Sequence, residues 1–200
     1  MRCVVPLAAL AVAAGCAGPP VRPSDLPPSP GVAGPSNVHL VVDGAPEPMA
    51  AEARAVVRGL DGWREATLGP DQPLTSACDG HDGVVVRPSL TRTHFMSNTH
   101  DRNVFLIYET AVVAGIPVAL VSLAAWPWDG ETIAEGQLEV APCDGSAPPR
   151  NRVESFRIRS EGRGLITEDR LRDAQNDAAV RGVTRKLFAA PRFGVEQGER

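Results

Sequence analysis

"ETIAEGQLEVAPCDGSAPPRNRVESFRIRS" (131–160) holds two segments in which apolar and polar residues alternate. Alternation with a period of two is typical of a strand with one buried face, so it predicts strands at 131–140 and 152–160. The inward residues are then Ala134, Leu138, Val140, Phe156 and Ile158. The Asp-Gly and Pro-Pro pairs between the segments predict a turn, and two strands joined by a turn pair in antiparallel fashion.

The segments on either side complete the order of elements. The patterns predict a first strand, a helix and a second strand, then a longer strand followed by a turn, at 37–44, 45–60, 63–68, 84–95 and 96–103. A last helix follows at 167–190. This order predicts an α+β fold: a single two-layer domain over 37–191 whose mostly antiparallel sheet carries two helices on one face.

The last predicted helix has a clear start and an irregular apolar stripe. Thr167 is placed to cap its first turn, and acidic residues follow at the end where the helix dipole is positive. Leu171 lies on its apolar face, from which Val183 and Leu187 are expected to drift away. Gly182 is interpreted as a bend that accommodates this drift.

The most apolar stretch is "VFLIYETAVVAGIPVALVSLAAWPW" (104–128). A membrane-spanning helix needs about 20 apolar residues, but Pro117 lies inside the run and breaks or kinks a helix. We therefore expect two buried strands, near 104–114 and 117–126. The alternatives are a hairpin that dips into one leaflet and a segment that crosses the bilayer. The residues that would contact a membrane or a partner are Ile116, Val118, Leu120, Trp126 and Trp128.

The N-terminus has the pattern of an export signal. One arginine precedes a run of about a dozen small and apolar residues, which ends in Ala13-Ala14-Gly15-Cys16. This ending resembles the lipobox of bacterial lipoproteins, although Ala13 stands where leucine is usual. The resemblance implies that Cys16 becomes the mature N-terminus and carries lipid. The alternative is an ordinary signal peptide cut near Ala14, with Cys16 incidental.

The lipobox resemblance sets the domain limits and the location. Residues 1–15 form the signal, 16–36 the lipidated cysteine with a Pro/Gly-rich extended tether, 37–191 the domain, and 192–200 a disordered tail. Two or more acyl chains hold a protein stably on a membrane without a spanning helix. Ala17 is not the Asp that favours retention at an inner membrane, so the resemblance implies the periplasmic face of the outer membrane.

Four cysteines are present, and two remain after Cys3 leaves with the signal and Cys16 is lipidated. Cys78 and Cys143 both precede an Asp-Gly pair in predicted loops of an exported chain. Because disulfides persist in oxidising compartments, we expect these two residues to be bridged. The alternative is two separate buried thiols.

Several functional classes find no support in the sequence. The net charge of −4 gives no basic face for nucleic acid. We find no serine-hydrolase elbow, zinc-protease motif or phosphate loop, so we assign no catalytic residue and no cofactor. Asp79, His81, Asp82 and Asp144 could attract a cation, but their spacing fits neither a calcium loop nor a zinc site, so we assign no metal.

These observations favour a non-catalytic lipoprotein that acts through contacts with an unidentified envelope protein in envelope assembly or maintenance. The order of elements also resembles the envelope-assembly lipoprotein domains of the CsgG and TolB N-terminal type. One alternative is a membrane-inserting or pore-associated subunit that uses the block 104–128. Another is an enzyme of unrecognised chemistry.

Overall fold

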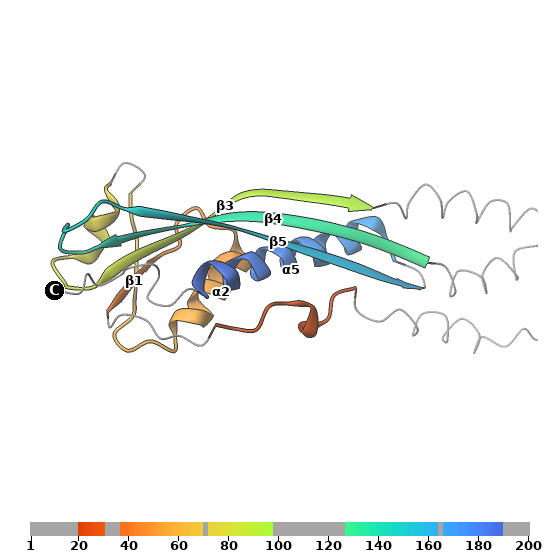
Figure 1. Ribbon diagram of the computed structural model, residues 1–200, viewed down its shortest axis with the longest axis horizontal. Coiled ribbons are helices and arrows are strands. Elements are labelled where there is room, and N and C mark those ends of the chain that lie inside the picture. Colours follow the sequence, from red (N-terminus) through yellow and green to blue (C-terminus); the bar gives the residue numbers. More distant parts are fainter. Residues whose placement is uncertain (1–19, 31–36, 70–71, 98–126, 164–165, 190–200) are drawn as a thin grey trace, which may run out of the picture. The chain divides into compact units, whose positions relative to one another are not determined.

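A computed structural model describes residues 20–30, 37–69, 72–97, 127–163 and 166–189 (Figure 1). Within them a short 3₁₀ helix, η1, precedes the first strand, and a second, η2, precedes the third. The elements in chain order are η1 (Pro23–Asp25), β1 (Val38–Val41), α2 (Glu47–Val57), β2 (Arg64–Ala66), η2 (Leu74–Cys78), β3 (Val84–Ser97), β4 (Pro127–Pro142), β5 (Arg150–Arg163) and α5 (Glu168–Phe188).

The five strands form one sheet in the order β2-β1-β3-β4-β5. The short strand β1 is parallel to both of its neighbours, with His39 beside Arg64 and Leu40 beside Val86. Helix α2 connects β1 to β2, which is the kind of crossover that parallel strands require. The long strands β3, β4 and β5 follow one another and make the sheet mostly antiparallel. The α+β fold class is confirmed.

Strand β4 shows the predicted alternation most clearly. Its even-numbered residues from Trp128 to Val140 are buried, and the odd-numbered residues between them are partly exposed. The prediction of a turn at 96–103 is wrong at its start, because β3 continues to Ser97. The Ser97 hydroxyl donates to the carbonyl oxygen of Asp129 at 3.0 Å, so the neighbouring strand supports this extension. The block 104–126 lies outside the described residues.

The domain divides into two compact units. One contains residues 26–94, 133–157 and 177–200, and we call it the disulfide unit; the other contains 1–25, 95–132 and 158–176, and we call it the tryptophan unit. Strands β3, β4 and β5 and helix α5 contribute residues to both units.

In the disulfide unit, both helices reach the same face of the sheet. A Cβ atom placed on Gly136 of β4 would lie 3.2 Å from Leu187 of α5 and 3.4 Å from Met49 of α2. Glycine therefore lets side chains from two helices meet over one strand. Leu138, two residues further along β4, is fully buried on the same face.

Helix α5 begins where the sequence predicts. The Thr167 hydroxyl accepts a hydrogen bond from the backbone N–H of Arg170 at 3.3 Å, which confirms the predicted cap. Val183 and Leu187, which were expected to drift away from the Leu171 face, are fully buried. The helix continues through Gly182. The missing side chain at this position lets the ring of Phe156 approach.

In the tryptophan unit, a buried amide joins α5 to the sheet. Gln175 is fully buried, and its Nε2 donates to the Gly130 carbonyl oxygen at 2.7 Å and to the Ser160 hydroxyl. Its Oε1 accepts from the hydroxyl of Thr132 at 3.3 Å. Because buried polar groups need partners, this network favours one position of α5 on β4 and β5.

Neither described helix combines the length and the apolar composition that a membrane crossing requires.

Candidate functional site

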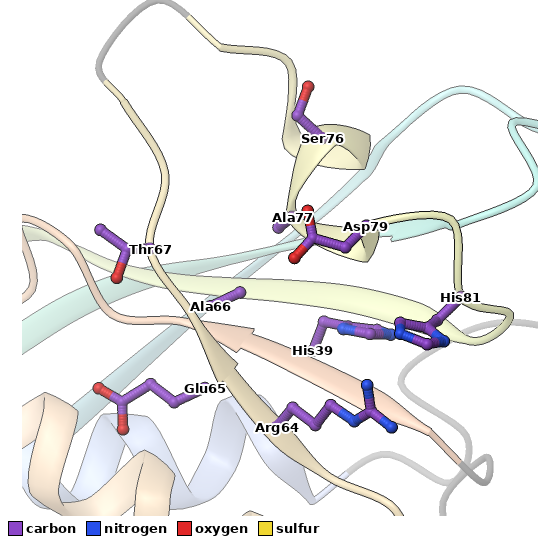
Figure 2. Close-up of a pocket in the computed structure, with 9 residues that line it drawn as sticks. All are labelled: His39, Arg64, Glu65, Ala66, Thr67, Ser76, Ala77, Asp79 and His81. Atoms are coloured by element: carbon purple, nitrogen blue, oxygen red, sulfur yellow. The ribbon is translucent and has the colours of Figure 1, made fainter.

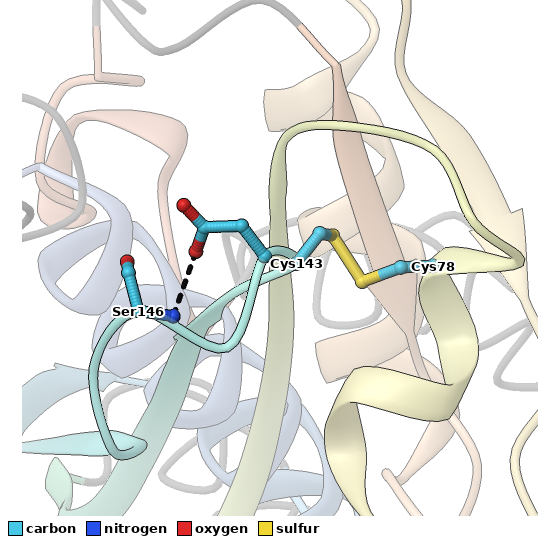
Figure 3. Close-up of a disulfide and its surroundings, with 4 residues drawn as sticks. Cys78, Cys143 and Ser146 are labelled. Carbon is cyan, nitrogen blue, oxygen red and sulfur yellow. Dashed lines mark hydrogen bonds between the residues drawn. A yellow bond between two sulfur atoms is a disulfide. The ribbon is translucent and has the colours of Figure 1, made fainter.

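The disulfide joins the end of η2 to the chain just after β4 (Figure 3). The Cα atoms of Cys78 and Cys143 are 5.7 Å apart, within the range that a disulfide allows, and 65 positions separate them in sequence. The predicted pairing is confirmed. The next residue, Asp144, accepts a hydrogen bond from the backbone N–H of Ser146 at 2.9 Å, and its hydrogen bonds with Ser146 lower the pKa of Asp144.

The disulfide borders a small apolar cluster on the back face of the sheet, which is the face opposite Leu138. Alternation along β4 places Ala141 on this back face, where η2 supplies Leu74 and Ala77. The other buried members are Val41, Leu68, Cys78 and Val85. The sequence predicts a loop where η2 lies, because five residues are too few to show helical periodicity.

A groove of about 190 Å³ lies beside this cluster, also on the back of the sheet (Figure 2). β1, β2, η2 and the segments that follow β2 and η2 supply its mostly polar walls. The lining residues are His39, Arg64, Glu65, Ala66, Thr67, Ser76, Ala77, Asp79 and His81. The groove is therefore built from segments that the parallel β1–β2 pair and the disulfide bring together.

His39 is the buried polar residue of the groove. It is 3% exposed, and its Nε2 has no hydrogen-bond partner. Burial is the largest cause that lowers the pKa of His39; the charges of Arg64 and His81 lower it further. A hydrogen bond with the backbone of Asp82 and the charge of Asp79 act in the opposite direction. The lowered pKa favours the neutral form of the ring at neutral pH.

Figure 2 shows how the other polar side chains lie around the groove. The rings of His39 and His81 lie together, the Arg64 guanidinium is directed toward them, and Glu65 points away. Such walls can hydrogen-bond a polar ligand and can take up protons in acid. In the part of the chain that the structure describes, no three His, Cys, Asp or Glu side chains are grouped to hold a metal ion.

Glu65 points away because it pairs with α2. Arg54 Nε and Nη2 donate to its two carboxylate oxygens at 3.0 and 2.9 Å. This hydrogen bonding is the main cause that raises the pKa of Arg54 and lowers that of Glu65. The pair is solvent-exposed, so it fixes the position of the short edge strand β2 more than it stabilises the fold.

A second hollow, of about 270 Å³, lies at the carboxyl end of β1. Asp43 accepts a hydrogen bond there from the backbone N–H of Leu68 at 2.7 Å. Arg87 also lines the hollow, and its Nη2 lies 2.6 Å from the Glu139 carboxylate. Both charged groups of this hollow are thus engaged within the fold.

The segment before β1 contacts helix α5, which is itself paired with α2. Arg185 of α5 donates from Nε to the Glu52 carboxylate at 2.6 Å and from Nη1 to the Pro27 carbonyl oxygen at 2.8 Å. The Glu52 side chain is 7% exposed. Pro27 lies within the predicted tether, and the bond from Arg185 attaches it to α5. Glu52 lies on the otherwise apolar face of α2, and this charge was the sequence signal for its ion pair with Arg185.

The remaining predicted site residues mostly fall outside the described residues. These are Cys16, Ile116, Val118, Leu120 and Trp126. Trp128 is described, and it is 4% exposed. Its indole packs so closely on Gly162 that a Cβ atom there would lie 2.3 Å from the ring. Little of this side chain is left to contact a membrane or partner.

The comparisons with known proteins include a structural likeness. The sequence matches no protein-family model and no curated protein. The structure is similar to that of a minor lipoprotein from Acinetobacter baumannii, with a TM-score of 0.32 and 8% sequence identity. The likeness covers 76% of this chain and 84% of that one. The function proposed below rests on the residues of this chain.

Proposed function

We propose that this protein is a non-catalytic lipoprotein, anchored through Cys16 at the periplasmic face of the outer membrane. It acts there through contacts with another envelope protein, in envelope assembly or maintenance. The observation that carries the proposal is the Cys78–Cys143 disulfide. Such a bridge is typical of oxidising compartments and rare in the cytosol, so it supports export. The lipobox-like ending at Cys16 then supports retention by lipid.

The groove supports a binding role. Its hydrogen-bonding groups come from the polar side chains around His39 and from backbone at the short edge strand β2. Edge strands and polar grooves are surfaces on which a protein segment can pair. A partner bound at the groove would not cover the helical face of the disulfide unit. That face stays free for the tether, which Arg185 holds at Pro27.

Substitution of one cysteine tests the anchor. Cys16→Ser should move the chain from the membrane fraction to the soluble fraction. Cys3→Ser is the matched control, because residue 3 leaves with the signal. This variant should stay in the membrane fraction. Mass spectrometry of the wild-type chain should find a diacylglyceryl group on Cys16. An unmodified mature N-terminus near Ala17 would refute the proposed anchor.

Photocrosslinking tests the protein contact. A photoreactive residue at Thr67, in the groove, should give a discrete adduct with one envelope protein in intact cells. The same residue at Val153, an exposed site on β5, serves as the control. The same adducts at both positions, or none at Thr67, would contradict a partner bound at the groove.

A further inference from the structure

Two histidine rings in the wall of the groove lie stacked on the back of the sheet. His39 belongs to β1 and is buried, whereas His81 belongs to the loop between η2 and β3 and is exposed. Their ring centroids are 6.4 Å apart and their planes differ by 17° (Figure 2). Buried polar atoms nearly always have a partner, so the unpartnered Nε2 of His39 is an exception that needs an explanation.

Charged groups from two elements face His39. Arg64 lies beside it on β2, in register. Asp79, His81 and Asp82 face it from the loop. Since Asp82 bonds the ring through its backbone and Nε2 has no partner, Nδ1 is the atom that donates to the Asp82 carbonyl. A proton added at Nε2 would therefore produce a buried cation beside Arg64.

The loop that carries His81 is fastened at both ends. Cys78 is held by the disulfide, and the Gly83 carbonyl oxygen accepts from the backbone N–H of Cys143 at 2.9 Å. Gly83 has a φ of 136°, and a Cβ atom there would lie 2.1 Å from the Asn37 carbonyl oxygen, so this end fits glycine. Between the two ends, residues 79–82 are exposed, and they contact His39 through the His81 ring and the Asp82 backbone.

We propose that the His39–His81 stack is an acid-sensitive latch. With the His39 ring uncharged, the stack holds residues 79–82 over the back of the sheet. When acid protonates His39, the two rings separate and the loop lifts, while the disulfide keeps η2 in place. The opened groove then presents the His39 ring and Arg64, a cationic pair suited to a carboxylate group of a partner. This proposal does not depend on lipid at Cys16.

The direction of the pH effect follows from the burial of His39. Its pKa in the closed protein lies below the ordinary value of 6.5. The neutral stack therefore contributes its full stability above about pH 6.5, and this contribution is lost as the pH falls toward the lowered pKa. Each unit of pKa difference between the closed and the open loop changes their ratio about tenfold.

Hydrogen exchange on the purified full chain tests the latch. The amide protons of residues 79–82, corrected for their intrinsic rates, should exchange about tenfold faster at pH 5 than at pH 7 for each unit of pKa difference. NMR titration of the imidazoles should give His39 a pKa below that of an unfolded peptide. Equal protection at the two pH values, or an ordinary pKa for His39, would overturn the proposal.

Two variants separate the latch from general acid sensitivity. His81→Ala removes the exposed ring, so residues 79–82 should exchange rapidly at pH 7 and show little further change at pH 5. His94→Ala is the matched control, because His94 is an exposed histidine on β3 and should leave the wild-type response intact. A wild-type response in His81→Ala would overturn the proposal, and this exposed position carries little risk of unfolding the chain.

Discussion

Gly182→Ala sets two physical effects against each other. Alanine is about 1 kcal/mol more favourable than glycine inside a helix, so helix propensity alone predicts a more stable protein. However, the new Cβ atom would lie 2.2 Å from Cδ1 and 2.3 Å from Cε1 of Phe156. Carbon atoms normally approach to about 3.5–4.0 Å, so the ring would have to move by more than about 1 Å.

The size of the clash decides the sign of the effect. Overpacking a well-filled site costs about 1–3 kcal/mol. Movement of the Phe156 ring also disturbs its contact with the Lys186 ammonium, which lies 5.9 Å from the ring centroid. We therefore expect Gly182→Ala to lower the free energy of unfolding by up to about 2 kcal/mol, after the gain in helix propensity is subtracted.

Urea unfolding with two further variants tests this reasoning. Gly59→Ala is the control, because its nearest new contact would be 3.9 Å away, and it should change stability by less than about 0.5 kcal/mol. Combining Gly182→Ala with Phe156→Leu should remove most of the extra cost, and the double-mutant cycle measures that coupling. A higher urea midpoint for Gly182→Ala alone would refute the clash.

Three other perturbations have defined outcomes. Replacing Cys78 and Cys143 by alanine opens a loop of 65 residues, and the chain-entropy relation gives a loss of about 4 kcal/mol; an unchanged urea midpoint would contradict this. Gln175→Leu leaves a buried carbonyl and a hydroxyl without their amide donor, so it should cost about 1–3 kcal/mol in the same assay; a neutral result would mean that the network adds nothing. Arg185→Ala removes the contact with Pro27, so a nonspecific protease should cut residues 20–30 faster, and unchanged cutting would show that this contact does not hold the segment.

Local patterns predicted the fold where one face of an element is buried. The alternation in β4 and β5 and the cap at Thr167 depend on residues a few positions apart, so a single sequence displays them. The buried position of Val183 depends instead on how closely α5 lies on β5. That distance follows from the missing side chain at Gly182, and sequence periodicity does not report it.

The candidate site was less predictable because its contacts are distant in sequence. The pairing of two cysteines could be inferred, since the predicted cleavage of the signal and lipidation of Cys16 would leave only two of them. The stack of His39 on His81 could not, because it follows from the course of η2, a five-residue turn without a periodic pattern. Glu52 carried a partial signal, since a charge on an apolar helix face predicts a buried partner without naming Arg185.

The bond from Arg185 to Pro27 also limits how far the domain could search above a lipid surface. Eleven positions separate Cys16 from Pro27, and twenty-one separate it from Asn37. A fully extended chain covers at most about 3.3–3.6 Å per residue, so a leash ending at Asn37 would allow a radius of about 70 Å and one ending at Pro27 about 36–40 Å. Because the accessible volume grows with the cube of the radius, a lipidated chain held at Pro27 would meet a neighbouring membrane protein at a several-fold higher local concentration. One guanidinium would thus set the range over which a lipid-anchored domain could find a partner.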